Sequence, residues 1–104
     1  MLVRELLPGL IPELENGLRQ DERPELAAKV ADLVIVDRCR CGDDFCGTFY
    51  TAPKPIGSYG PGHETIALDC NKCDLNLDVV NGEIVCVEVL YRDEIRDKLA
   101  VALP

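Results

Sequence analysis

Cysteines are the residues of this chain whose types and spacing could do chemistry. All six lie between Cys39 and Cys86. Three belong to the segment CRCGDDFC (residues 39–46), and two more belong to CNKC (residues 70–73). Thiolates bind zinc and other soft metals, thiols form reversible disulfides, and a free cysteine also packs as a small apolar side chain. Metal binding, redox chemistry and packing are therefore the three interpretations to weigh.

The first segment is expected to be the tip of a β-hairpin, with residues 42–45 as its loop. In that register Cys41 faces Cys46, and Cys39 faces Thr48. Directly paired residues of an antiparallel hairpin lie on the same face. The three thiols would then lie within a few ångströms of one another.

A small zinc-binding domain is one function that these thiols predict. Zinc in structural sites takes four ligands in a tetrahedron, commonly spaced by two to four residues. The spacing here is one residue between the first two cysteines and four between the next two, so the match is partial. The ligands would be Cys39, Cys41 and Cys46, with His63, Cys70 or Cys73 as the fourth. The sequence alone assigns no metal ligand and no cofactor, and zinc is kept as an alternative.

A thiol redox protein is the second alternative, with Cys41 and Cys46 as a reversible pair. The neighbouring arginines would lower the thiol pKa values, whereas the neighbouring aspartates would raise them, so no activated thiolate is implied. Cys86 lies among aliphatic residues of a predicted strand and is interpreted as a small apolar core residue.

The sequence favours binding over catalysis. It contains no clear nucleophile–base pair, no paired carboxylates at a loop tip and no phosphate-binding loop, so no catalytic residue is assigned. His63, the single histidine, lies next to glycines in a predicted loop, where a histidine is usually solvated, so it is not assigned as the partner of a catalytic cysteine. We therefore expect a binding module for a protein partner whose identity the sequence does not give, acting as a monomer or a homodimer.

Composition narrows the class of partner and the compartment. The 104 residues fit one domain, and 19 acidic against 11 basic residues give a net charge of −8. That charge opposes binding to nucleic acid and to anionic membranes. No apolar run is long enough to span a bilayer, and the first residues do not resemble a signal peptide. These features predict a cytoplasmic protein with reduced thiols.

Hydrophobic periodicity predicts an α+β fold, with two N-terminal helices packed on an antiparallel β-meander of about five strands. The helices are expected over residues 12–19 and 24–32, after a weak first turn at 1–7. The strands are expected over residues 33–41, 49–51, 65–70, 74–80 and 83–91. Residues 92–104 would form a short helix over 93–99 or a tail. The single domain then divides into a helical part (1–32), a sheet (33–91) and this C-terminal segment.

The register of the last two hairpins follows from two-residue turns at 71–72 and at Asn81-Gly82. That arithmetic places Cys86 and Glu88 on the core face, with Leu77 and Leu75. It leaves the opposite face of the last strand unusually apolar, with Val85, Val87, Val89 and Tyr91. We expect the C-terminal segment to cover those residues, with a symmetric dimer as the alternative.

Three segments carry a resemblance to known proteins: RCRCGDDFCGTFYT (residues 38–51), YGPGH (59–63) and DVVNGEIVCVEVL (78–90). Together they resemble a group of small bacterial proteins built on a cysteine-bearing hairpin that ends in Thr-Phe-Tyr. The resemblance covers roughly residues 33–90. It implies a bacterial cytosolic protein without an established activity, and it transfers no functional residue.

Overall fold

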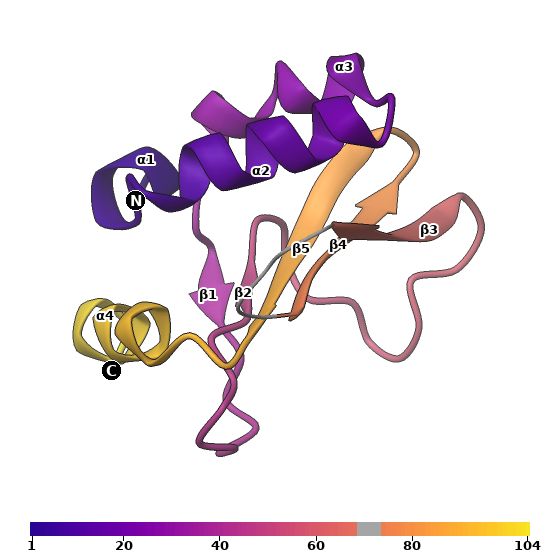
Figure 1. Cartoon of the computed structure of the whole chain (residues 1–104). Coiled ribbons are helices and arrows are strands. Elements are labelled where there is room, and N and C mark those ends of the chain that lie inside the picture. Colours follow the sequence, from indigo (N-terminus) through magenta and orange to yellow (C-terminus); the bar gives the residue numbers. More distant parts are fainter. Residues whose placement is uncertain (69–73) are drawn as a thin grey trace.

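Over the residues that the structure describes, the fold combines four α-helices with a five-stranded antiparallel sheet (Figure 1). A computed structural model describes residues 1–68 and 74–104. The helices are α1 (Val3–Leu6), α2 (Leu10–Gln20), α3 (Pro24–Ala27) and α4 (Asp93–Ala102), with a 3₁₀ turn η1 (Val30–Asp32). The strands are β1 (Asp37–Arg38), β2 (Phe49–Tyr50), β3 (His63–Leu68), β4 (Asp74–Val80) and β5 (Glu83–Leu90). The α+β prediction is confirmed, but the helices are not all N-terminal, because α4 follows the last strand.

The strand order across the sheet is β1-β2-β5-β4-β3. A simple meander was the wrong prediction for the whole sheet, since β2 pairs with β5 and not with β3. The non-local pair joins Phe49 to Val87 and Tyr50 to Cys86. This places the cysteine-bearing β1–β2 hairpin beside the end of the chain's last strand.

A β-bulge in β5 changes the predicted register of the last hairpin. The Asn81-Gly82 turn pairs Val80 with Glu83 as expected, and both turn residues have positive φ, at 51° and 80°. Beyond Ile84 the pairing shifts by one residue, so that Asp78 faces Cys86. A bulge inserts one residue on one strand and thereby exchanges the two faces of everything that follows it.

The bulge corrects the predicted faces of β5. Val87 and Val89 are fully buried in the core, opposite Leu77 and Leu75, and do not form an exposed apolar stripe. Glu88, predicted on the core face, lies on the other face, where it accepts a hydrogen bond from the Asn76 side chain at 2.8 Å. The exchange removes an uncompensated carboxylate from the core, which would be costly.

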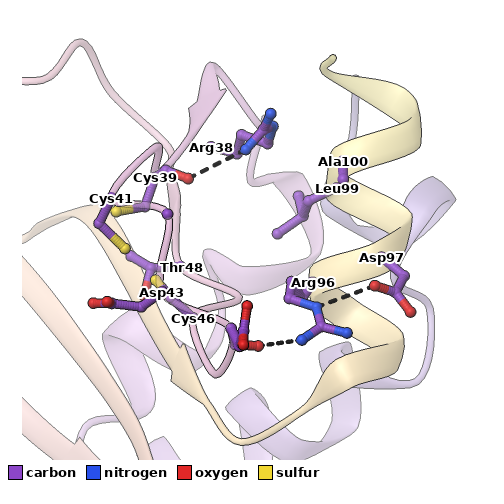
Figure 2. Close-up of a pocket in the computed structure, with 12 residues that line it drawn as sticks. Arg38, Cys39, Cys41, Asp43, Cys46, Thr48, Arg96, Asp97, Leu99 and Ala100 are labelled. Carbon is purple, nitrogen blue, oxygen red and sulfur yellow. Dashed lines mark hydrogen bonds and ion pairs between the residues drawn. The ribbon is translucent and has the colours of Figure 1, made fainter.

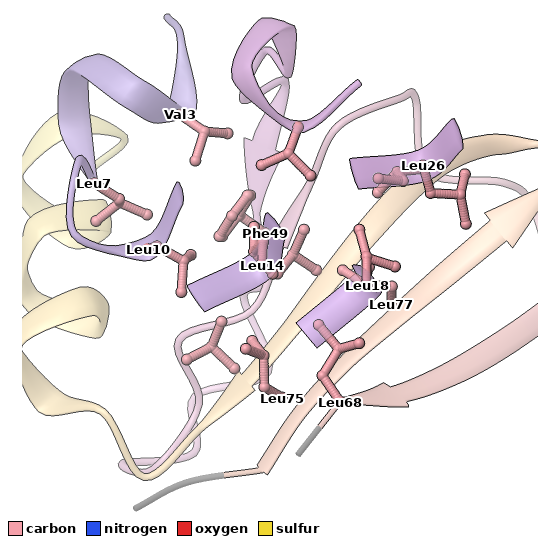
Figure 3. Packing of buried hydrophobic residues seen from close by; sticks show 14 of the residues in the cluster. Val3, Leu7, Leu10, Leu14, Leu18, Leu26, Phe49, Leu68, Leu75 and Leu77 are labelled. Carbon is pink, nitrogen blue, oxygen red and sulfur yellow. The ribbon is translucent and has the colours of Figure 1, made fainter. Parts of the chain in front are cut away.

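Helix α2 is the main cover of the sheet. Its buried residues Leu10, Leu14 and Leu18 recur every four positions and face strand residues such as Leu68 and Leu77 (Figure 3). Gly17 lets the helix approach closely, since a Cβ there would lie 3.2 Å from the Leu68 side chain. The helix begins two residues earlier than predicted, because Pro12 is tolerated within the first turn.

Other boundaries also differ from the predictions; β3, for example, begins at His63, two residues earlier than expected. The helix expected over residues 24–32 divides into the single turn α3 and the 3₁₀ turn η1. The strand expected over 33–41 contracts to two residues, with only an isolated bridge between Val34 and Leu2 before it. This strand is at the edge of the sheet, and short edge strands are common in native sheets because they offer few unpaired backbone groups to another chain.

Helix α4 extends to Ala102, beyond the predicted Leu99, and is not a tail. Ile95 and Leu99 are buried in the core cluster. At its start Arg92 forms a paired salt bridge with Glu13 of α2, with N–O distances of 2.9 and 3.1 Å. The C-terminal segment therefore completes the core from the end where the cysteine loop lies.

Candidate metal centre

The β1–β2 hairpin brings the three clustered cysteines to its tip. Its register pairs Asp37 with Tyr50 and Arg38 with Phe49, and the Cys39 amide donates to the Thr48 carbonyl at 2.8 Å. Cys41 and Cys46, which the sequence predicts to face each other, lie beyond these paired residues, and their thiols are hydrogen-bonded. We define the cysteine loop as residues 39–46.

The sulfur atoms of Cys39, Cys41 and Cys46 all lie within 4.8 Å of one another. Figure 2 shows them gathered in the loop, with α4 on the opposite side of the pocket. All three are free thiols; Cys41 is exposed and the other two are half-buried. Among the described residues no histidine, aspartate or glutamate adds a fourth ligand atom to this group.

His63 does not join the cysteines, contrary to one prediction for the fourth ligand. Its Nε2 atom lies 2.8 Å from the Asp78 carboxylate, and its ring packs against Tyr59 with centroids 4.8 Å apart. His63 begins β3, on the edge of the sheet opposite to the β1–β2 hairpin. Cys70 and Cys73, the other predicted sources of that ligand, lie outside the described residues.

Backbone and hydroxyl donors surround two of the sulfurs. The Asp43 amide acts to lower the pKa of Cys41, but hydrogen bonds with the Cys46 and Cys39 thiols outweigh it and raise that pKa to about 11. Burial acts to raise the pKa of Cys46, but hydrogen bonds from the Thr48 hydroxyl and amide, with those of the other thiols, lower it. Amide donors to sulfur favour the thiolate, which is the metal-binding form.

Helix α4 holds the cysteine loop from one side. A Cβ at Gly47 would lie 3.3 Å from the Arg96 amide nitrogen and from Ile95 Cγ2, so the chain passes close to the helix there. The Arg96 guanidinium donates to the Asp44 carbonyl, and that of Arg40 to the Pro104 carbonyl at 3.2 Å. A cavity of about 540 Å³ lies between loop and helix and is lined by all three cysteines (Figure 2).

A second cavity, of about 430 Å³, lies on the other side of the cysteines. It separates the cysteine loop from the sheet face opposite α2, and three aromatic residues, Phe45, Tyr50 and Tyr59, form part of its wall. Its polar lining includes Lys54, Asp78 and Glu88. We call this the sheet-side cavity.

Cys86 lies on the sheet-side cavity and not in the main core. It is buried and hydrogen-bonded to the Tyr59 hydroxyl. Burial, with the nearby Asp78 carboxylate, raises the pKa of this thiol to about 12. It is therefore a neutral thiol at ordinary pH, and its prediction as a buried small residue holds, although on the opposite face of the sheet.

Comparison with known proteins gives no match: no family model, no curated protein and no solved structure matches this chain. The chemistry of the candidate site is therefore inferred from its geometry alone. In the part of the chain that the structure describes, every helix is too short or too polar to cross a bilayer.

Sequence reasoning identified the three cysteines but missed the residues that form the sheet-side cavity. Tyr59 and Lys54 belong to the connection between β2 and β3, and Asp78 and Glu88 face them from β4 and β5. Their proximity depends on the β2–β5 pairing and the bulge. The local signal for them is the grouping of aromatic residues between positions 45 and 59.

Proposed function

We propose that this protein is a small metal-binding module that holds one zinc ion through Cys39, Cys41 and Cys46. The observation that carries the proposal is the mutual proximity of the three sulfurs, within 4.8 Å. With Zn–S bonds of about 2.3 Å, tetrahedral geometry needs sulfurs about 3.8 Å apart. The required contraction is at most about 1 Å, in a loop that already turns at Gly42 with φ of 82°.

The donor set selects the class of metal. Three thiolates are soft ligands, which favour zinc or copper(I) over magnesium or calcium, whose ligands are oxygen atoms. The hydrogen bonds from Thr48, which lower the pKa of Cys46, also favour the thiolate of that residue. Metal binding by a site formed only in the folded chain adds its free energy to the stability of the fold. A bound ion would therefore stabilise the loop.

Titration of reduced, metal-free protein with zinc against a chromogenic chelator tests the proposal. We expect one ion per chain and a rise in melting temperature on loading. The variants Cys39→Ser, Cys41→Ser and Cys46→Ser should each weaken binding by at least tenfold. Cys86→Ser is the matched control and should bind zinc as the wild type does. Binding that is unchanged in all three loop variants would contradict the proposal.

Self-association is a second candidate function, favoured by one exposed aromatic pair. The rings of Phe45 and Tyr91 stack with centroids 5.4 Å apart, although 41% and 60% of these residues are exposed. Tyr91 has a positive φ of 66°, a strained conformation for a residue with a large side chain. Sedimentation analysis at increasing concentration should show a dimer that Phe45→Ser with Tyr91→Ser dissociates. A wild-type protein that stays monomeric contradicts this candidate.

The redox alternative remains a prediction. Titration of the thiols in a glutathione buffer tests it, and six reduced, slowly reacting cysteines would argue against it.

A further inference from the structure

We propose that the sheet-side cavity binds a primary ammonium group, carried either by a small amine or by a lysine side chain of another protein. This inference goes beyond the proposed metal site, because the cavity needs no metal ion to attract a cation. Three features of its described lining carry the inference: a surplus of acidic side chains, aromatic walls, and a volume of about 430 Å³. Sites for small molecules have volumes of about 300–1,000 Å³.

The charge of the sheet-side cavity is negative. Asp43, Asp78 and Glu88 line it against a single cation, Lys54, so the charged side chains of the described lining leave a net charge of −2. Only 24% of the Asp78 side chain is exposed, and solvent screens a half-buried charge less than an exposed one. The chain as a whole carries a net charge of −8, which also draws cations toward it.

Aromatic rings form another part of the wall. Phe45, Tyr50 and Tyr59 line the same cavity, and the face of an aromatic ring attracts an ammonium within about 6 Å of the ring centroid. Lys54 already makes such a contact, since its ammonium lies 5.7 Å from the centroid of Tyr50. Lys54 is exposed, so a ligand can displace it from the ring. Carboxylates beside aromatic rings therefore favour an organic cation.

The carboxylates select an ammonium that still carries protons. Asp78 Oδ1 accepts a hydrogen bond from the Thr65 hydroxyl at 2.9 Å and lies 2.8 Å from His63 Nε2. Glu88 Oε1 accepts from the Asn76 side chain at 2.8 Å. These contacts hold each carboxylate through one oxygen, and among the described residues no donor bonds the other oxygen. A primary ammonium has N–H donors for such an oxygen, whereas a quaternary ammonium has none.

Calorimetric titration of the reduced, metal-free protein at low ionic strength tests the inference. n-Butylammonium should bind at one site per chain and shift the ring proton resonances of Phe45, Tyr50 and Tyr59. The neutral isostere n-butanol and the anion butyrate should not bind at the same concentrations. A tripeptide with a central lysine and blocked ends distinguishes the sources. Tighter binding than that of butylammonium would support a lysine side chain as the ligand, and weaker binding would support a free amine.

Matched variants locate the site. Glu88→Gln should weaken the binding of butylammonium by a few-fold and keep the fold, because an amide oxygen can still accept the Asn76 hydrogen bond. Glu25→Gln removes the same charge from exposed α3, on the other side of the sheet, and should leave binding unchanged (Figure 1). Lys54→Met should tighten binding by a few-fold, since it removes the cation that competes for Tyr50.

Three results would overturn the inference and leave the proposed function standing. The first is a wild-type protein that does not bind butylammonium, or binds n-butanol equally well. The second is equal weakening by Glu88→Gln and Glu25→Gln, which would indicate diffuse attraction to an acidic protein. The third is weaker binding by Lys54→Met, which would show that Lys54 does not compete with the ligand.

Discussion

Cys86 and the cysteines of the loop contain the same functional group in opposite environments. Cys86 is enclosed between the sheet and Tyr59, and its pKa is raised to about 12, whereas hydrogen bonds from Thr48 lower that of Cys46. The first thiol is therefore a packing residue, whereas the second forms its thiolate more readily. Neighbouring groups, and not the residue type, separate the two roles.

This difference predicts that the contributions of Cys86 and Cys46 to the unfolding free energy of the metal-free protein change in opposite directions with pH. Each contribution is the difference between the wild type and the corresponding alanine variant. The folded state retains the Cys86 proton above pH 9.0, where the unfolded thiol loses it, so the stability that this thiol adds must fall as the pH rises from 9 towards 12. For Cys46, with a lowered pKa, the added stability must rise as the pH approaches 9. Urea unfolding of wild type, Cys86→Ala and Cys46→Ala between pH 7 and 10.5 measures both slopes. Slopes of the same sign would contradict the assignment.

At the scale of elements, the bulge in β5 decides which side chains reach the core and which line the sheet-side cavity. Val85 is the inserted residue, and its carbonyl accepts from the Thr51 amide at 3.0 Å. After it, Cys86 and Glu88 turn toward the cavity, and Val87 turns toward α2. The sheet-side cavity, a candidate binding surface, therefore exists because Val85 of β5 has no paired residue in β4.

The bulge predicts different costs for two identical substitutions. Val87→Thr places a hydroxyl in the fully buried core and should cost about 1–3 kcal/mol of unfolding free energy. Val85→Thr, at the half-buried bulge, should change it by no more than about 0.5 kcal/mol. Urea unfolding at neutral pH compares them. Equal costs would favour the uninterrupted hairpin register, in which both valines share a face.

Two residues of helix α4 allow a similar comparison of a buried with an exposed position. Leu99 is 1% exposed, and Leu99→Ala should cost about 2–5 kcal/mol through lost packing and a cavity. Val101 is 84% exposed, and Val101→Ala should be neutral or slightly stabilising, because alanine favours the helix by up to about 0.7 kcal/mol. Thermal and urea unfolding measure both. A small effect of Leu99→Ala would show that α4 is not part of the core.

At the scale of the whole molecule, the C-terminal helix joins the core, the cysteine loop and α2. Ile95 and Leu99 enter the core, Arg92 pairs with Glu13, and Arg96 holds the loop at Asp44. Loss of this helix would affect all three contacts together. The geometry of the cysteine loop and the stability of the domain are therefore coupled through α4.

Truncation after Tyr91 tests that coupling. Without Ile95 and Leu99 the core is open at one end, and exposed apolar surface promotes association. We expect the truncated protein to melt at a lower temperature, to scatter more light than the full chain, and to bind zinc more weakly. A truncated protein that remains monomeric, equally stable and equally able to bind zinc would contradict the role of α4.

The sequence by itself determined the features that depend on neighbours along the chain. Helix period in the first third and alternation afterwards predicted the α+β class, and short turns predicted the hairpin pairs 68–75, 80–83 and 39–48. The grouping of three thiols follows directly from the last of these. Local geometry fixes such contacts, because a tight turn leaves few ways to pair its arms.

Only the tertiary structure decided what depends on distant segments. The pairing of β2 with β5, the bulge at Val85 and the contact of His63 with Asp78 arise from competition among strands and faces across the whole sheet. Burial of Val87 and removal of Glu88 from the core favour the bulged register, although the turn alone predicts the regular one. The same choices create the cavity beside the cysteines, so a candidate binding site appears only where the complete fold brings four separate segments together.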